Sequence, residues 1–162
     1  MRVKALVWRY LTGVCLFGFL TATVQAEPAF SDQRTVLRIE SEVDSIEAGP
    51  YLEILEDPGG RWELADVRGG SPAWTVSGSG NPNPGFSDSV FWVRLTVWND
   101  APERRKMFLR LGYPHHDDLR LYSVSDEMVK AEAVTGDRYV FDQRPFPHVY
   151  FVFPLELSPQ QY

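Results

Sequence analysis

The feature that most restricts the fold of this chain is its series of short runs of alternating apolar and polar residues, separated by turn residues. Such alternation over roughly four to eight residues is the signal of a half-buried β-strand. The alternating runs lie at 35–41, 51–56, 90–99, 106–111, 119–124 and 149–153, and turn residues stand at 57–60, 102–104, 112–114 and 136–137. A helical period is not sustained anywhere, and a turn or two of helix is expected near 45–48 or 64–68. The sequence therefore predicts an all-β, antiparallel sandwich or barrel.

The first 26 residues have the three-part layout of a secretory signal peptide. A basic start with Arg2, Lys4 and Arg9 precedes an apolar stretch at 10–24 and the small-x-small site Val24-Gln25-Ala26. The apolar run is shorter than the roughly 20 residues that a membrane-spanning helix needs, so we expect cleavage after Ala26 rather than retention as an anchor. Cys15 follows a valine where lipoprotein processing requires a small residue, so lipidation is not expected.

Cleavage would change the charge of the chain. Three of 16 basic residues and none of 22 acidic residues leave, so the net charge becomes 13 minus 22, or −9. This balance argues against nucleic acid and anionic lipid as partners. The single cysteine also leaves, so the remaining residues 27–162 must be stabilised by a hydrophobic core rather than by disulfides. We expect a lead-in and first strand at 27–50 and one β-sandwich domain at 51–162.

A group of aromatic and arginine side chains is the first candidate for a binding surface. If the strands of the second half are neighbours in one sheet, one face would present Trp92, Arg94, Trp98, Phe108, Arg110, Arg120 and Tyr122. Aromatic rings offer flat apolar faces and arginines offer fixed forks for hydroxyls or carboxylates, which suits a sugar or a small organic acid. The alternative is structural: the tryptophans cover a sheet edge or pack under a loop, and the arginines are solvated. The long Ser/Gly/Asn/Pro loop at 77–85 is a second region of interest, because long ordered loops often carry function.

Several short motifs, in order, resemble one known family. The segment 85–95 reads GFSDSVFWVRL and is followed by Trp98-Asn99; LGYP at 111–114 precedes DLRLY at 118–122; and the tail holds TGD at 135–137, QRP at 143–145 and FPLEL at 153–157. The run YLEILED at 51–57 resembles the family's opening strand. The pattern resembles the second extracellular module of the seven-transmembrane receptors with diverse intracellular signalling modules (7TMR-DISM), from about Tyr51 to the end.

The resemblance implies a jelly-roll β-sandwich like that of carbohydrate-binding modules, acting as a periplasmic sensor. The parent receptor would carry seven membrane helices and a histidine kinase or diguanylate cyclase output. Because the family continues past this point into another strand and the membrane bundle, we expect the chain to be a fragment. Its location would be periplasmic after cleavage, and inner-membrane only through residues beyond Tyr162.

An independent catalytic or metal site has little support in the sequence. The His115-His116-Asp117-Asp118 run is the best candidate, but adjacent histidines rarely close one metal site. A nucleophile elbow and a phosphate cradle are both missing. We therefore expect no enzyme activity, cofactor or metal in this fragment. The run more simply forms a loop that links two strands, and its side chains could touch a ligand at the rim.

Three functions remain open at this point. The first is a sensor for a small carbohydrate or carboxylate, for which the candidate ligand-binding residues are Trp92, Arg94, Trp98, Arg120, Tyr122, Tyr113, His115 and Arg144. The second is a protein-binding sandwich, whose partner is a second copy or a partner receptor. The third is a free-standing secreted carbohydrate-binding module or hydrolase.

Overall fold

The computed structural model of the chain describes residues 2–9, 35–40, 42–69, 73–83, 85, 87–125 and 128–159. Most of these residues lie in strands, and the described part contains one short α-helix. The elements are β1 (Arg2–Arg9), β2 (Val36–Ile39), η1 (Gly49–Tyr51), β3 (Leu52–Asp57), α1 (Leu64–Gly69), β4 (Thr75–Val76), β5 (Val90–Asn99), β6 (Arg105–Leu111), β7 (Asp118–Ser125), β8 (Met128–Thr135), η2 (Phe141–Gln143) and β9 (Phe151–Leu157). The all-β prediction is confirmed.

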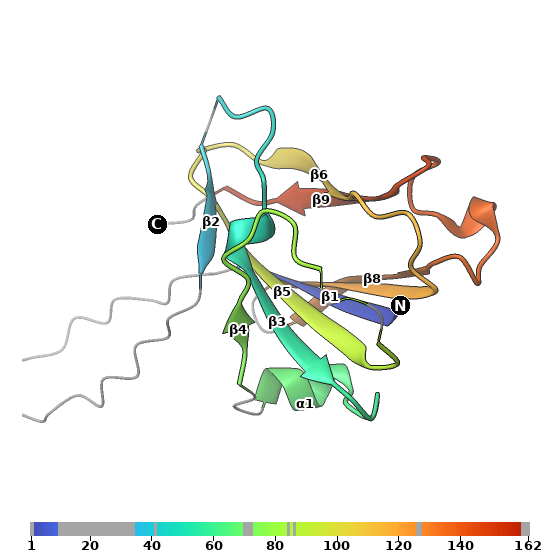
Figure 1. Cartoon of the computed structure of the whole chain (residues 1–162). Helices are drawn as coiled ribbons and strands as arrows, with labels where there is room; N and C mark the ends of the chain where they lie inside the picture. Colours follow the sequence, from blue (N-terminus) through green and yellow to red (C-terminus); the bar gives the residue numbers. More distant parts are fainter. Residues whose placement is uncertain are drawn as a thin grey trace, which may run out of the picture.

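The strands of the described residues form two sheets. The larger sheet has the order β4-β3-β5-β1-β7-β8, with β2 pairing to the far end of β5, and the smaller sheet holds β6 and β9. In Figure 1 the β6–β9 pair lies on one side of the larger sheet and α1 lies on the other. The larger sheet is mixed rather than antiparallel throughout, since β1 runs parallel to both its neighbours and β2 runs parallel to β5.

Several local predictions are confirmed at the level of elements. Strand β5 spans the whole of the predicted run 90–99, and β3, β6 and β7 begin and end within one residue of their runs. The turn at 57–60 closes with a hydrogen bond from the Gly60 amide to the Asp57 carbonyl, 3.1 Å, and Gly60 has a φ of 60°. The helix expected near 64–68 is α1. Turn chemistry and period-two patterning were therefore reliable where both were strong.

The last strand differs from its prediction. β9 begins at Phe151 and not at Val149, whose side chain is exposed, and residues 141–143 form a 3₁₀ turn ahead of it. The backbone amide of Tyr150 donates to Nδ1 of His148 at 3.0 Å, a local bond that holds this segment in a loop. Such a side-chain-to-backbone bond competes with strand pairing. The strand therefore begins two residues later than the alternating pattern predicted.

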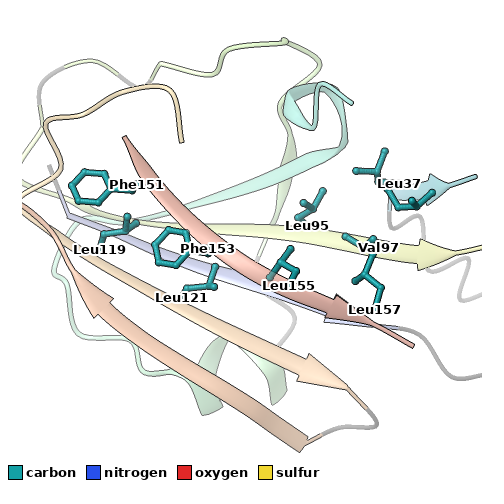
Figure 2. Packing of buried hydrophobic residues seen from close by; sticks show 10 residues of the cluster. Leu37, Leu95, Val97, Leu119, Leu121, Phe151, Phe153, Leu155 and Leu157 are labelled. Carbon is teal, nitrogen blue, oxygen red and sulfur yellow. The ribbon is translucent and has the colours of Figure 1, made fainter. Parts of the chain in front are cut away.

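The main core fills the space between the two sheets. Along β9, Phe151 and Phe153 are about 1% exposed, and Figure 2 shows them facing Leu119 and Leu121 of β7. The buried members are Leu37, Ile39, Leu95, Val97, Leu119, Leu121, Phe151, Phe153, Leu155 and Leu157. The alternate residues of β6 join this core from its inward face, as the alternation predicted. Close packing of aliphatic and aromatic side chains is therefore what holds the sheets together.

Strand β1 lies in the segment predicted to be a leader. Arg2–Arg9 pairs with β5 on one side and with β7 on the other, in the middle of the larger sheet. The rest of the predicted signal peptide, Met1 and Tyr10 to Ala26, lies outside the described residues, as do residues 27–34. Cleavage after Ala26 therefore stays a prediction.

Candidate functional site

The predicted aromatic and arginine face is divided between two sheets. Strand β6, which carries Phe108 and Arg110, belongs to the smaller sheet, so these two residues do not join the face of β5 and β7. Strand β1 also separates β5 from β7, which places them about two strand spacings, roughly 9.5 Å, apart. Along β5, Trp92 and Trp98 are six residues apart, or roughly 20 Å. One joint surface was expected only if these strands were neighbours in one sheet, and the strand order does not meet that condition.

Trp92 and Tyr122 lie inside the protein. Trp92 is fully buried and Tyr122 is 6% exposed, and their rings stack with centroids 6.2 Å apart. They form a second core with Leu55, Val67, Val90 and Val124, against which Trp62, Leu64 and Trp74 pack. Since α1 supplies Val67 and Leu64, the helix covers this face of the sheet. The structural alternative for Trp92, packing beneath a covering segment, matches its position.

Arg94 is held by a carboxylate of the neighbouring strand. Its Nε lies 2.7 Å from Oε2 of Glu53 and its Nη2 lies 2.7 Å from Oε1, a bidentate pair between residues in register. The two side chains are only 12% and 6% exposed. The guanidinium also stands 4.3 Å over the ring of Trp74. Because its fork and one face are engaged, Arg94 has a structural role in this arrangement.

Arg120 and Trp98 are the more accessible members of the predicted set. The Arg120 Nε lies 3.3 Å from Oδ1 of Asp118, and this hydrogen bond raises the pKa of the guanidinium further above its ordinary value. Trp98 is half-buried, and the guanidinium carbon of Arg38 lies 5.8 Å from its ring. These two side chains occupy different strands and different ends of the sheet, so they do not form one site.

A rim cluster brings together the other three predicted residues, Tyr113, His115 and Arg144. Nδ1 of His115 lies 3.6 Å from one carboxylate oxygen of Asp137, and Nη2 of Arg144 lies 3.8 Å from the other. The rings of Tyr113 and His115 meet edge to face at 5.5 Å, and both side chains are exposed. The structure therefore brings His115 and Arg144 to one carboxylate, with Tyr113 packed against His115.

Arg144 mainly fastens the loop that precedes β9. Its Nη1 donates to the carbonyl oxygens of His148, 2.7 Å, and Val149, 2.9 Å, and its guanidinium lies 4.5 Å over the ring of Phe151. At Gly136 the backbone packs directly against the loop that holds His116 and Asp117. Gly136 has a positive φ of 136°, and a Cβ there would overlap the Asp117 carbonyl. Only glycine tolerates that backbone approach.

His116 is buried behind the rim, 5% exposed, with its ring 5.8 Å from Phe151. Burial lowers the pKa of His116 from 6.5 to about 4, although the nearby carboxylates of Asp137 and Asp117 act in the opposite direction. The imidazole is therefore neutral at pH 7, and among the described residues its Nδ1 has no hydrogen-bond partner.

The buried histidine predicts an acid-sensitive stability. Between pH 6.5 and 4 the unfolded chain binds a proton at His116 and the native chain does not, so stability falls as the pH falls through this window. We expect a loss of about 1–3 kcal/mol by pH 4, constant below that pH. Urea unfolding of the wild type and of His116→Gln from pH 7 to 4 isolates this contribution. Parallel pH profiles for the two proteins would contradict the assignment.

An open groove lies at the β3–β4 edge of the larger sheet, beside the long loop noted in the sequence. Its volume is about 620 Å³, within the range of small-ligand sites, and it is open to solvent. Its polar lining consists of hydroxyls, amides and one carboxylate, and its apolar lining includes the inward-facing Phe91; the residues are Ile54, Glu56, Thr75, Val76, Ser77, Ser79, Asn81, Pro82, Asn83 and Phe91. The sequence indicated the loop but gave no signal for Glu56 or Thr75, which reach the groove only through strand pairing.

The loop over this groove is shaped by its own polar groups. The Ser79 amide donates to the Ser77 hydroxyl, and the Asn81 amide donates to the Ser79 hydroxyl, both at 3.3 Å. Gly49 lies so close to the Gly80 carbonyl that a Cβ would overlap it, which fixes the loop against η1. The hydroxyl of Ser89 donates to Glu56 Oε1 at 2.6 Å. The groove is thus bounded by an ordered backbone and a positioned carboxylate.

A concave site with an apolar base and a few placed polar groups is where small ligands usually bind a domain. The family comparison makes this specific, because residues 49–162 match the model of the family described as 7TMR-DISM extracellular 2. The chain belongs to that family, as the sequence motifs indicated. It is therefore related to sensor domains of membrane receptors, in a family of extracellular location that is typically non-catalytic.

The other comparisons add no relatives. No curated protein and no solved structure matched the chain. Within the described residues, no helix is long and apolar enough to cross a membrane.

Proposed function

We propose that this chain is the periplasmic ligand-sensing domain of a membrane signalling receptor with a histidine kinase or diguanylate cyclase output, and that its ligand is a small carbohydrate. The family supports the sensor role. The observation that carries the choice of ligand is the groove at the β3–β4 edge, with its hydroxyl, amide and carboxylate lining. Jelly-roll architecture, which carbohydrate-binding modules share, is part of this proposal.

The chemistry of the groove favours a neutral hydroxylated ligand over a carboxylate. None of the described lining residues is Lys or Arg, and Glu56 would repel an anion. The three arginines first considered for a carboxylate each have an acidic partner: Arg94 pairs with Glu53, Arg120 with Asp118 and Arg144 with Asp137. The amides instead donate and accept the hydrogen bonds that sugar hydroxyls need, the Glu56 carboxylate accepts them, and Phe91 offers apolar area.

A ligand in this groove would bridge two parts of the fold. Thr75 and Glu56 belong to the paired strands β4 and β3, and Asn81 and Asn83 belong to the loop that leads into β5. A sugar that binds both parts more tightly in one arrangement than in another would shift the population of the receptor toward it. This differential affinity is what a sensor requires.

Removal of one groove amide tests the site. We expect Asn81→Ala to weaken the Kd of a bound sugar by about 5–30-fold, the effect of one lost hydrogen bond to a ligand. The side chain of Asn81 is exposed, so the thermal midpoint should stay within about 1 °C of wild type. Isothermal titration with neutral mono- and disaccharides, and with dicarboxylates, measures both the affinity and the ligand class.

Gln143→Ala is the matched control, because it removes an exposed amide at η2, outside the groove. It should leave the Kd unchanged. Equal sugar binding by wild type and Asn81→Ala, or binding of dicarboxylates alone, would rule out the groove proposal.

An exposed aromatic pair favours protein binding as a second function. Phe108 and Phe146 are 59% and 39% exposed, and their rings meet edge to face at 5.4 Å. Apolar area of this kind marks interaction surfaces when it is contiguous. Analytical ultracentrifugation of the wild type and of Phe108→Ser measures self-association. Self-association of the wild type that Phe108→Ser abolishes would support protein binding as the function.

A further inference from the structure

One wall of the groove carries a hydrogen-bond acceptor that the fold holds in place. Glu56 lies on β3, and an ionised carboxylate only accepts hydrogen bonds. The hydroxyl of Ser89, whose side chain is 7% exposed, donates to Oε1 of Glu56 at 2.6 Å. Oε2 of the same carboxylate accepts no hydrogen bond from the described residues. The buried serine therefore orients the carboxylate and leaves one oxygen to accept from a ligand.

The loop that leads into β5 supplies a hydrogen-bond donor to the same groove. Oδ1 of Asn83 accepts from the Gly85 amide at 3.0 Å, while its side-chain NH₂ donates to none of the described residues. The hydroxyl of Ser77, by contrast, is used within the loop, since it donates to the Ser79 carbonyl and accepts from the Ser79 amide. Asn83 is exposed and lines the groove, so its NH₂ group can donate to a ligand.

Apolar side chains lie next to the carboxylate. Phe91 of β5 stands opposite Glu56 in the strand register, and Ile54 precedes Glu56 by two residues on the same face of β3. Both side chains line the groove, together with Val76, which is 47% exposed. The groove thus offers an acceptor, a donor and uncovered apolar area within one site of about 620 Å³.

These three features match the three parts of an acetamido group. Its N–H donates, its carbonyl oxygen accepts and its methyl is apolar, and the trans amide directs the N–H and the C=O in opposite directions. A hydroxyl both donates and accepts, so it does not distinguish Glu56 from Asn83 and brings no methyl. Two walls with fixed and opposite hydrogen-bonding roles therefore favour the amide over the hydroxyl.

We propose that the ligand of the groove is a neutral sugar with an acetamido group, an N-acetylhexosamine. The amide N–H donates to Glu56, the amide oxygen accepts from Asn83, and the methyl packs against Phe91. The sugar hydroxyls are left for Thr75 and Asn81, which also line the groove. This inference rests on the proposed sugar-sensing function and narrows the class of its ligand.

Isothermal titration of matched sugar pairs tests the ligand class. N-acetylglucosamine is compared with glucose, and N-acetylgalactosamine with galactose. In at least one pair the acetamido sugar should bind about tenfold or more tightly than its parent hexose, through an added methyl and two directed hydrogen bonds. Equal Kd values within each pair would overturn this inference and leave sugar sensing intact. Absence of binding by all four sugars would overturn both.

Glu56→Gln tests the assigned contact. Ser89 still donates to Oε1 of the new amide, so an NH₂ donor replaces the free carboxylate oxygen and faces the N–H of the ligand. We expect the acetamido sugar to bind at least about tenfold more weakly, and the parent hexose to change by less than about threefold, because a hydroxyl can accept from the new donor. Asn83→Asp, which exchanges donor for acceptor, should cause the same selective loss.

Glu156→Gln is the matched control for Glu56→Gln. It makes the same substitution at a side chain of β9 that is 59% exposed and lies outside the groove. Both Kd values should stay at their wild-type levels. If Glu56→Gln weakened the acetamido sugar and its parent hexose by equal factors, Glu56 would not recognise the acetamido group, and the inference would be wrong.

Discussion

Arg94→Ala is expected to lower the free energy of unfolding by about 3–5 kcal/mol, because it leaves a buried carboxylate without its partner. The Arg94–Glu53 pair is bidentate at 2.7 Å, and its two side chains are 12% and 6% exposed. Each strand supplies one residue at the same register, so the pair also ties β3 to β5. Urea unfolding at pH 7 measures the loss.

Two further variants test whether the loss of stability comes from the buried ion pair itself. Arg104→Ala removes an exposed arginine that lies 3.6 Å from Glu156, and should change stability by no more than about 0.5 kcal/mol. The double substitution Arg94→Met with Glu53→Leu should recover most of the lost stability, since an apolar pair needs no ionic partner. If Arg94→Ala were as stable as Arg104→Ala, the buried ion pair would have no structural role.

Trp92→Ala is expected to cost about 3–5 kcal/mol through loss of buried area and the cavity that remains. Trp92 is fully buried and stacks on Tyr122 beneath the segment that includes α1. Trp92→Phe should cost less, about 1–2 kcal/mol. It keeps an aromatic ring and removes an indole Nε1 that has no hydrogen-bond partner among the described residues.

Thermal and urea unfolding of the two tryptophan variants check this order. Against a total stability of typically 5–15 kcal/mol, the alanine variant should be close to unfolding at 37 °C. Equal stability of Trp92→Ala and wild type, together with lost sugar binding, would instead return Trp92 to the role of a ligand contact.

The strands were predictable where alternation and turn chemistry agreed. Strand β5 is long, β-branched and aromatic, and its bounds follow from the sequence. Strand β8, by contrast, contains Met, Lys, Glu and two Ala, which are weak strand formers, and no prediction was made for it. It forms because pairing with β7 supplies a tertiary context. Strand β1 was not expected because its residues read as the basic start of a leader.

The candidate site was harder to predict than the strands. Alternation correctly placed Trp92 and Arg94 on one face of β5, but it assumed that only the opposite face is core. The helix α1 and its flanking residues cover the Trp92 face as well, which a single strand's pattern cannot reveal. The groove is assembled from two strands and a loop that are separated in sequence, so only the register of β3 with β4 and β5 brings Thr75, Glu56 and Phe91 together.

Amide chemical-shift mapping on the isotope-labelled chain, with the neutral sugar that binds most tightly, tests the central claim most directly. The account predicts saturable shifts concentrated at residues 54–56 and 75–83, which line the groove, and small changes at the rim residues Tyr113 and His115. Saturable shifts confined to the rim, or none with any sugar at millimolar concentration, would contradict carbohydrate sensing in this groove.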